Sequence, residues 1–168
     1  MKTRFLKLSS IFFVLFTLAS LLVVTVPVTA TSNNLWAWGL NSSSQLGYSL
    51  ILYTTEPTQV SGLSGVVAMK GGTSHSIALK TDGTVWAWGS NSYNQLGDGT
   101  TKSRGTPAKV IGLDSVTAIV AGGVHCLAMK SDGSLWDWGL NNHGQLGDGT
   151  QINRSTPVQV SGLSWVNL

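Results

Sequence analysis

The sequence predicts an all-β chain assembled from repeated units, and three observations point to this fold class. The stretch LWDWGLNNHGQLGDGT at 135–150 recurs as VWAWGSNSYNQLGDGT at 85–100 and in a degenerate form at 35–50, always 50 residues apart. A fixed period of this size indicates an array of like structural units. Asp-Gly pairs stand between alternating apolar runs, and glycine is frequent, so the body of the chain is expected to form short strands and turns rather than helices.

The segment 75–89, HSIALKTDGTVWAWG, predicts two strands joined by a tight turn. Asp82-Gly83 between two apolar runs is typical of a two-residue hairpin turn, in which both central residues need a positive φ. Trp86 and Trp88 share one face of the second strand, and small apolar residues occupy the other. Because both faces are apolar, we expect this strand to be covered on both sides.

Two further strands complete each unit. Val66–Lys70 predicts a third, and a weak fourth begins at Thr58, Ala108 and Val158, just after a proline in each unit. The stretch Asn41–Pro57 and its repeats predict a long loop rich in Gly, Asn and Ser. Four short strands in each unit of this length predict a β-propeller, with a β-solenoid as the alternative architecture.

Several spaced motifs recur together in a fixed order over residues 33–168. They are W-A-W-G, then N-x-x-x-Q-L-G-D-G-T, then P-x-x-V-x-G-L, then G-x-x-H-x-x-A-x-K-x-D-G. In these motifs the chain resembles the regulator of chromosome condensation repeat family. The resemblance implies a propeller of about seven blades. It also implies kinship with guanine-nucleotide exchange factors of nuclear small GTPases and with secreted propellers that inhibit β-lactamases.

Compared with a ring of about seven blades, the chain is long enough only for an incomplete arc of about three blades. We divide it into a segment 1–30 and a partial propeller 31–168, with units 31–80, 81–130 and a truncated 131–168. The last unit stops before its second half, so we expect the chain to be a fragment of a longer protein. Open blade edges would then allow self-association.

The first thirty residues predict a secretory signal peptide. Lys2, Arg4 and Lys7 precede the apolar run Ile11–Val24, and small residues lead to a cleavage site after Ala30. An uncleaved anchor helix is the alternative, which the shortness of the apolar run disfavours. We therefore expect the protein to be secreted or held at the cell surface, with no membrane contact beyond this segment.

Charge excludes nucleic acid as an expected partner. The formal net charge is +3, but three of the ten Lys and Arg residues lie in the predicted signal segment. The remaining seven balance the seven Asp and Glu residues, so the body of the chain is formally neutral. Nucleic-acid binders normally carry a basic patch because phosphate contacts dominate their affinity.

Five polar residues that invite a chemical interpretation are expected to be structural. His75 and His125 repeat in register within an apolar strand, and each is predicted to bond the next blade. The single cysteine, Cys126, is predicted to be a buried, inert thiol. Asp98 and Asp148 in QLGDGT resemble calcium-loop residues, but their spacing favours turn chemistry. We predict no catalytic, cofactor-binding or metal-binding residue and no cofactor.

The tryptophans recur in every unit, whereas Asp137 occurs in one unit only. The six paired tryptophans are predicted to form the core because they recur strictly, although they could serve as sugar-stacking platforms. Asp137 stands where Ala37 and Ala87 stand in the other units. Buried and unpaired, such a carboxylate would cost several kcal/mol. The sequence leaves open whether Asp137 meets water or a partner.

Variation between units concentrates in the loops, which predicts the binding surface. Repeat proteins recognise partners through such loops on one rim or face. The candidate partner-binding residues are Tyr93, His143, Arg104, Asn153, Arg154 and Trp165. We expect a non-enzymatic module that binds a protein partner through these loops. A carbohydrate-binding or adhesion module is the alternative, and an exchange factor-like regulator is less well supported.

Overall fold

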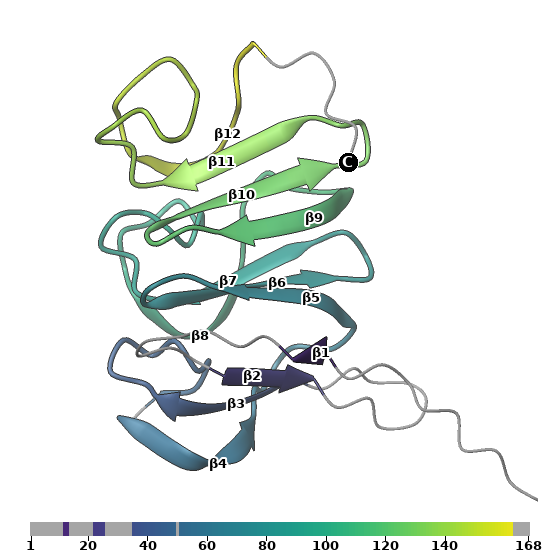
Figure 1. Cartoon of the computed structure of the whole chain (residues 1–168), viewed down its shortest axis with the longest axis vertical. Coiled ribbons are helices and arrows are strands. Elements are labelled where there is room, and N and C mark those ends of the chain that lie inside the picture. Colours follow the sequence, from purple (N-terminus) through teal and green to yellow (C-terminus); the bar gives the residue numbers. More distant parts are fainter. Residues whose placement is uncertain (1–11, 14–21, 26–34, 50, 163–168) are drawn as a thin grey trace, which may run out of the picture.

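The computed structural model describes residues 12–13, 22–25, 35–49 and 51–162. These residues form strands and turns and no helix, which confirms the all-β prediction for this part of the chain. In the described ranges there is accordingly no helix that is long and apolar enough to cross a membrane. The strands form three four-stranded antiparallel sheets that follow one another along the long axis of the molecule (Figure 1).

We call the sheets blades 1, 2 and 3. Blade 1 contains β1 (Phe12–Phe13), β2 (Leu22–Thr25), β3 (Leu35–Leu40) and β4 (Tyr53–Gln59). Blade 2 contains β5 (Val66–Gly71), β6 (His75–Lys80), β7 (Val85–Gly89) and β8 (Arg104–Lys109). Blade 3 contains β9 (Val116–Ala121), β10 (His125–Lys130), β11 (Leu135–Gly139) and β12 (Arg154–Gln159).

Blades and sequence units are out of phase. The predicted unit 31–80 contains β5 and β6, but these strands pair with β7 and β8 of the following unit. Each of blades 2 and 3 therefore takes two strands from the end of one sequence unit and two from the start of the next. This exchange ties successive units together, because no blade in this arrangement can form from one unit alone.

The Asp-Gly hairpin has a different turn from the predicted one. The Lys80 N–H donates to the Thr84 carbonyl at 3.0 Å, which leaves three residues, Thr81–Gly83, in the turn. Gly83 has φ 74°, whereas Asp82 is not among the residues with positive φ. The prediction of a two-residue turn was therefore wrong. The Asp82 carboxylate instead accepts the Thr84 N–H and hydroxyl, which stabilises the longer turn.

The fourth strands also begin earlier than predicted. β4, β8 and β12 start inside the stretch that was predicted to be loop, and each ends one residue after the predicted strand begins. Each contains a proline near its middle, at the point where its register with the neighbouring strand shifts. An outer strand tolerates proline there because only one of its edges is paired.

Part of the predicted signal segment lies in blade 1. β2 pairs antiparallel with β3, with Leu22 opposite Trp38 and Thr25 opposite Leu35. This is the place that β6 occupies beside β7 in blade 2. Residues 12–13 form β1 beside β2, and the rest of segment 1–30, including the predicted cleavage site after Ala30, lies outside the described residues. Its role as a signal peptide stays a prediction.

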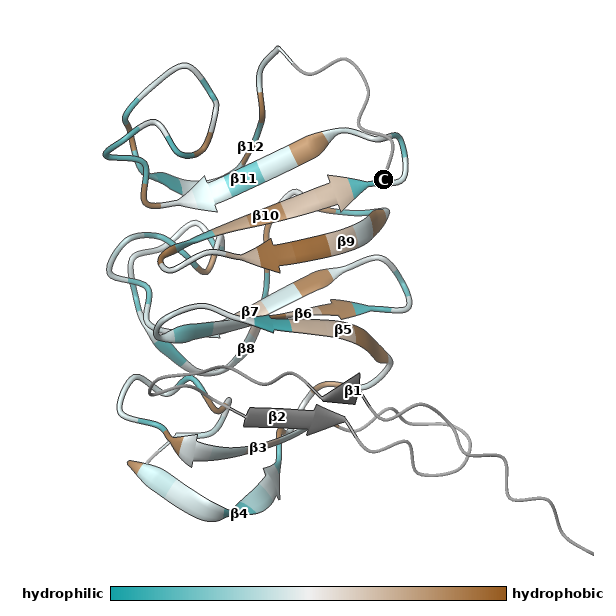
Figure 2. Cartoon of the chain, in the orientation of Figure 1, coloured by the Kyte–Doolittle hydropathy of each residue, from teal (hydrophilic) through white to brown (hydrophobic). Residues whose placement is uncertain are grey.

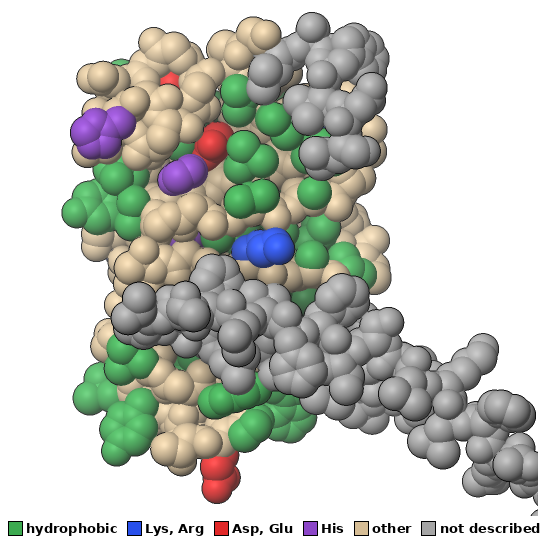
Figure 3. All heavy atoms as spheres, viewed as in Figure 1, with side chains coloured by type: hydrophobic (Ala, Val, Ile, Leu, Met, Phe, Trp, Pro, Cys, Tyr) green, Lys and Arg blue, Asp and Glu red, His purple; other side chains and the backbone are tan. Residues whose placement is uncertain are grey.

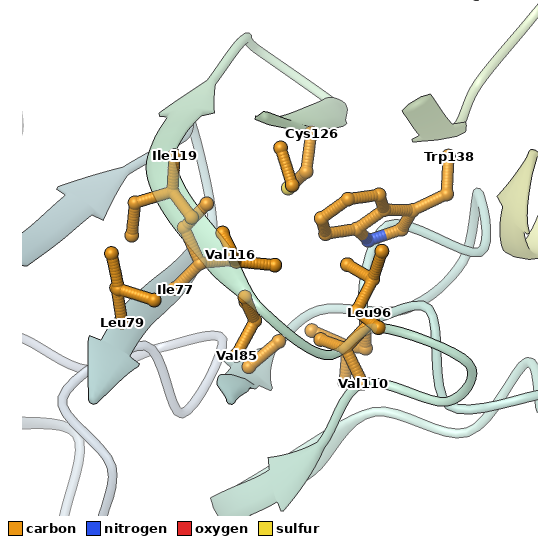
Figure 4. Packing of buried hydrophobic residues seen from close by; sticks show 12 residues of the cluster. Ile77, Leu79, Val85, Leu96, Val110, Val116, Ile119, Cys126 and Trp138 are labelled. Carbon is orange, nitrogen blue, oxygen red and sulfur yellow. The ribbon is translucent and has the colours of Figure 1, made fainter. Parts of the chain in front are cut away.

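The core lies between the blades. Ile77, Leu79 and Val85 of blade 2 face Cys126 and Trp138 of blade 3 in one buried cluster (Figure 4). A second cluster joins blades 1 and 2 in the same way. Among the strands at this core, β9 is strongly apolar, whereas the outer strand β4 is not (Figure 2). Blade-on-blade packing, the basis of the propeller prediction, is thus confirmed.

In blades 2 and 3, one tryptophan of the pair joins its blade to the preceding blade, whereas both tryptophans of blade 1, Trp36 and Trp38, are only half-buried. Trp88 and Trp138 are fully buried, and their indole N–H groups donate to the carbonyls of Gln45 and Gln95 at 2.8 and 3.0 Å. The other member, Trp86 or Trp136, is half-buried beneath a lysine ammonium group. The prediction that the pairs are core is therefore confirmed fully for Trp88 and Trp138 only.

Candidate protein-binding rim

A buried asparagine organises the long loop between the third and fourth strands of each blade. In blade 2, the Asn91 side-chain carbonyl accepts the Leu96 N–H at 3.0 Å. Its amide group donates to the carbonyls of Thr100 and Lys102 and to the Asp98 carboxylate. Asn141 makes the matching bonds in blade 3. These bonds satisfy the buried amide and fix the path of the loop.

The tip of each loop has the same backbone but a different side chain. The Gln95 side-chain carbonyl accepts the Tyr93 N–H at 2.9 Å, and Gln145 holds His143 at the same distance. In blade 1 the equivalent residue is Ser43, held by its glutamine at 2.8 Å. The next residue has a positive φ in all three loops. Tyr93 is 47% exposed and His143 is exposed, so a rigid frame presents both side chains to solvent.

Arg104 and Arg154, two predicted binding residues, are engaged within their own loops. Arg104 pairs with Asp98, and Arg154 pairs with Asp148 at 2.7 Å. Burial raises the pKa of Asp98, but hydrogen bonds from Arg104 and Thr100 outweigh burial and lower it. The same balance brings the pKa of Asp148 to about 2. The predicted turn role of both aspartates is confirmed, because each accepts the N–H of the threonine two residues on. Both arginines are held in ion pairs, although 40 and 32% of their side chains stay exposed.

The structure describes one of the remaining two candidates, Asn153. The Asn153 side-chain carbonyl accepts the Asn141 N–H at 2.8 Å, so this side chain closes its loop. Trp165 lies outside the described residues. Of the six predicted binding residues, Tyr93 and His143 are therefore those that the structure leaves exposed at the loop tips.

The first loop departs from this frame. Tyr48 replaces the aspartate and packs against the cluster between blades 1 and 2. Four large apolar side chains at the ends of this loop are at least half exposed, and none of them is among the predicted binding residues: Leu40, Ile51, Leu52 and Tyr53. The signal that could have found them is the apolar run at 51–53, which follows directly after the motif breaks down.

His75 and Cys126 have the predicted structural contacts, whereas the predicted bond of His125 to a following blade stays a prediction. His75 Nε2 lies 3.0 Å from Cys126 Sγ, which joins blade 2 to blade 3. Burial, with the nearby His125, lowers the pKa of His75 to about 4. Cys126 is fully buried, and burial with the nearby Asp137 carboxylate raises the pKa of its thiol. Both side chains are therefore uncharged at neutral pH.

We expect Cys126 to resist thiol reagents in the native protein. The thiolate is the reactive form, and both burial and the raised pKa suppress it. With 5,5′-dithiobis(2-nitrobenzoate) at pH 8, the folded chain should react at least 100-fold more slowly than the chain in 6 M guanidinium chloride. Equal rates in the two conditions would show that the thiol is accessible.

Asp137 in β11 is buried and is 3% exposed. Its carboxylate accepts the N–H of the adjacent Trp138 at 2.8 Å. None of the ion pairs of the described residues involves it. Burial raises the pKa of Asp137 to about 7, against the smaller effect of this hydrogen bond. The carboxyl group is therefore mostly protonated, and so uncharged, below pH 7.

The described residues contain no grouping of three His, Cys, Asp or Glu side chains that could hold a metal ion. On the face shown in Figure 3, charged side chains are few and scattered. These residues form a surface with few charges and with an exposed tyrosine and histidine at its loop tips.

Stacked four-stranded blades with variable loops define a β-propeller repeat protein. The sequence matches the regulator of chromosome condensation (RCC1) repeat over residues 32–79, 82–129 and 132–167. A second description of the same repeat matches residues 66–95 and 116–145. The chain belongs to the RCC1 repeat family, as its motifs predicted. No curated protein sequence matches it.

Solved propellers share the fold. Human WBSCR16 is 26% identical, with a TM-score of 0.73 over 84% of this chain and 38% of that one. Yeast RCC1 (Prp20), in a complex with Kap60, is 21% identical, with a TM-score of 0.74 over 84% of this chain and 35% of that one. Prp20p from Saccharomyces cerevisiae is 20% identical, with the same TM-score over 84% and 36%. The chain thus spans little more than a third of each structure.

Proposed function

We propose that the chain is a non-catalytic protein-binding module, exported or held at the cell surface. The observation that carries the proposal is the repeated loop frame, in which one backbone presents Ser43, Tyr93 and His143 at equivalent positions. Repeat proteins recognise partners through loops that share one backbone conformation and differ in their side chains. Tyrosine is also enriched at protein interfaces, because its ring combines a large apolar area with a hydroxyl group.

Two further observations support a binding role rather than catalysis. The histidine nearest to the cysteine, His75, is buried with it between blades. The loop carboxylates of Asp98 and Asp148 are paired with arginines. Similar propellers also bind proteins: yeast RCC1 (Prp20) binds Kap60, and binding to Gsp1p and histones is described for Prp20p. Export is supported by the basic start, apolar run and small residues of segment 1–30.

The test replaces both tip residues by serine, the residue of the first loop. The Tyr93→Ser/His143→Ser chain should fold with an unchanged thermal midpoint, because both side chains are exposed and only their backbone N–H groups are bonded to the frame. We expect affinity capture from the culture medium to recover a protein with the wild-type chain. The variant should recover at least tenfold less of it, measured by quantitative mass spectrometry.

Three outcomes would contradict the proposal. The variant could recover the same proteins in the same amounts. The wild-type chain could bind a glycan array and no protein, which would favour the carbohydrate-binding alternative. It could also accelerate nucleotide release from a small GTPase, which would favour the exchange-factor alternative. A Thr101→Ser chain serves as the control, because its exposed side chain belongs to the same loop but not to the tip.

A further inference from the structure

The first loop presents a compact group of exposed apolar side chains. Leu40, Ile51, Leu52 and Tyr53, which we call the apolar corner, are 50, 50, 70 and 66% exposed. At the equivalent positions, blade 2 carries Ser90, Thr101, Lys102 and Ser103, all polar. The corner is therefore a property of the first loop and is not required by the shared fold.

Backbone bonds hold the corner together. Leu40 lies opposite Tyr53 in the β3–β4 ladder. The Asn41 N–H donates to the Leu52 carbonyl at 2.7 Å, and the Asn41 side chain donates to the Ile51 carbonyl at 2.7 Å. The four side chains thus project from two backbone segments, the end of β3 and residues 51–53, which these bonds hold side by side. Together they expose on the order of 400 Å² of largely apolar surface, which is in the range of functional patches on monomers.

The adjoining edge strand is poorly suited to pairing with another strand. The Glu56 N–H in β4 donates to the Thr54 hydroxyl, and the Glu56 carbonyl accepts from the hydroxyls of Thr54 and Thr58. The next residue, Pro57, has no N–H to donate. Two successive residues of the edge therefore offer no free N–H group for strand addition. A partner at the apolar corner has to bind through side chains.

Area and charge narrow the choice of partner. A stable dimer needs roughly 800 Å² on each subunit, about twice what the corner offers, so a second copy of the chain does not fit. Glu56 is the only charged residue between Leu35 and Met69. An acidic residue beside an apolar patch suits a partner that combines an apolar stripe with a basic side chain.

We infer that the apolar corner binds a short amphipathic helix of a partner protein, with apolar residues at i, i+3 or i+4 and i+7 and a flanking Lys or Arg. With strand addition disfavoured, a helix is the common recognition element that presents such a stripe. The inference rests on the proposed function, since it names one place on the variable loops and the kind of segment that binds there.

A display library of helix-forming peptides, selected on the full chain, tests the inference. We expect enriched peptides to share the apolar stripe and a basic residue. Leu52→Asp should weaken their binding at least tenfold, and Glu56→Gln two- to threefold. Ile152→Asp is the matched control, because Ile152 is the equivalent residue of blade 3, is 62% exposed and stands between polar neighbours. It should change binding less than twofold, and all three variants should keep the wild-type thermal midpoint.

Several results would overturn the inference. Selected peptides could lack the stripe, or could bind Leu52→Asp as well as wild type. The chain could sediment with phosphatidylcholine vesicles in a manner that depends on Leu52, which would assign the corner to a membrane. It could also form a dimer that Leu52→Asp dissociates. Retained peptide binding by Tyr93→Ser/His143→Ser is expected. If that variant loses its captured protein while Leu52→Asp changes no binding, the proposed function stands and this inference fails.

Discussion

Replacing Trp88 with alanine is expected to reduce the free energy of unfolding by about 3–5 kcal/mol. The indole is fully buried between blades 1 and 2, and Leu35, Leu46 and Val60 belong to the same cluster. Its removal leaves a cavity and takes a hydrogen-bond donor from the Gln45 carbonyl. Because domains are stable by only about 5–15 kcal/mol, this single change removes at least about a fifth of the total. Urea unfolding followed by circular dichroism measures the loss.

The neighbouring Trp86→Ala variant is the control for that experiment. Trp86 is half-buried, and Lys80 stacks on its ring at 5.6 Å. Its replacement is expected to lower the free energy of unfolding by less than about 2 kcal/mol. The ring of Trp86 buries less apolar area on folding than that of Trp88, and a surface cation–π contact contributes little. Equal losses in the two variants would mean that the indole buried between blades is not the principal contact that joins them.

Replacing Asp137 with alanine is expected to stabilise the protein above neutral pH. The carboxyl of Asp137 has its ordinary pKa of 3.8 in the unfolded chain, whereas burial raises its pKa to about 7 in the folded chain. Between these two pH values the folded chain keeps the proton and the unfolded chain loses it. The contribution of this carboxyl to stability is fully present below pH 4 and is lost as the pH rises to 7. The loss amounts to as much as about 4 kcal/mol. The alanine found in the other two units carries no such penalty.

His75 gives the stability of the protein the opposite pH dependence, over an overlapping pH range. Its pKa falls from 6.5 to about 4 on folding, so its contribution is present above pH 6.5 and is lost as the pH falls toward 4. In the wild-type chain the two slopes partly cancel between pH 4 and 6.5. Removing Asp137 should leave the histidine slope, so the stability of the variant should rise over that range. Urea midpoints at pH 4.5, 6.5 and 8.5 separate the two effects.

Asp114→Asn provides the matched control, because it removes one carboxylate from an exposed ion pair with Lys130. The difference in stability between this variant and wild type should hardly change between pH 4.5 and 8.5. The prediction for Asp137 is wrong if Asp137→Ala gains no more stability at pH 8.5 than at pH 4.5.

Much of the fold could be predicted because the repeat fixes which residues share a face. The pairing of Trp86 with Trp88, opposite small apolar residues, indicated a strand covered on both sides, and Trp88 lies in the core between blades. The contact of His75 with the next blade followed from its repetition in register. The turn at Asp82 was predicted at the right place but with the wrong type, because side-chain bonds to Thr84 favour the longer turn.

The candidate site was less predictable, because exposure in a loop depends on how the loop closes. Arg104 and Arg154 looked as available as Tyr93 in the sequence, yet each pairs with an aspartate six residues away. The apolar corner was missed because its members come from two segments, Leu40 and 51–53, that β-pairing brings together. The sequence marked the loops as variable but not which side chains in them remain free.

The sequence by itself determined the repeat, the family, the strands and the apolar faces that pack blade on blade. These follow from periodicity, since residues at fixed spacing meet the same neighbours in every unit. Only the tertiary structure decided which loop side chains are bound and which are exposed, how β5 and β6 join the next unit, and that Asp137 is buried. The physical reason is that hydrogen-bond partners and burial depend on the path of the backbone in space, which a pattern of residue types does not specify.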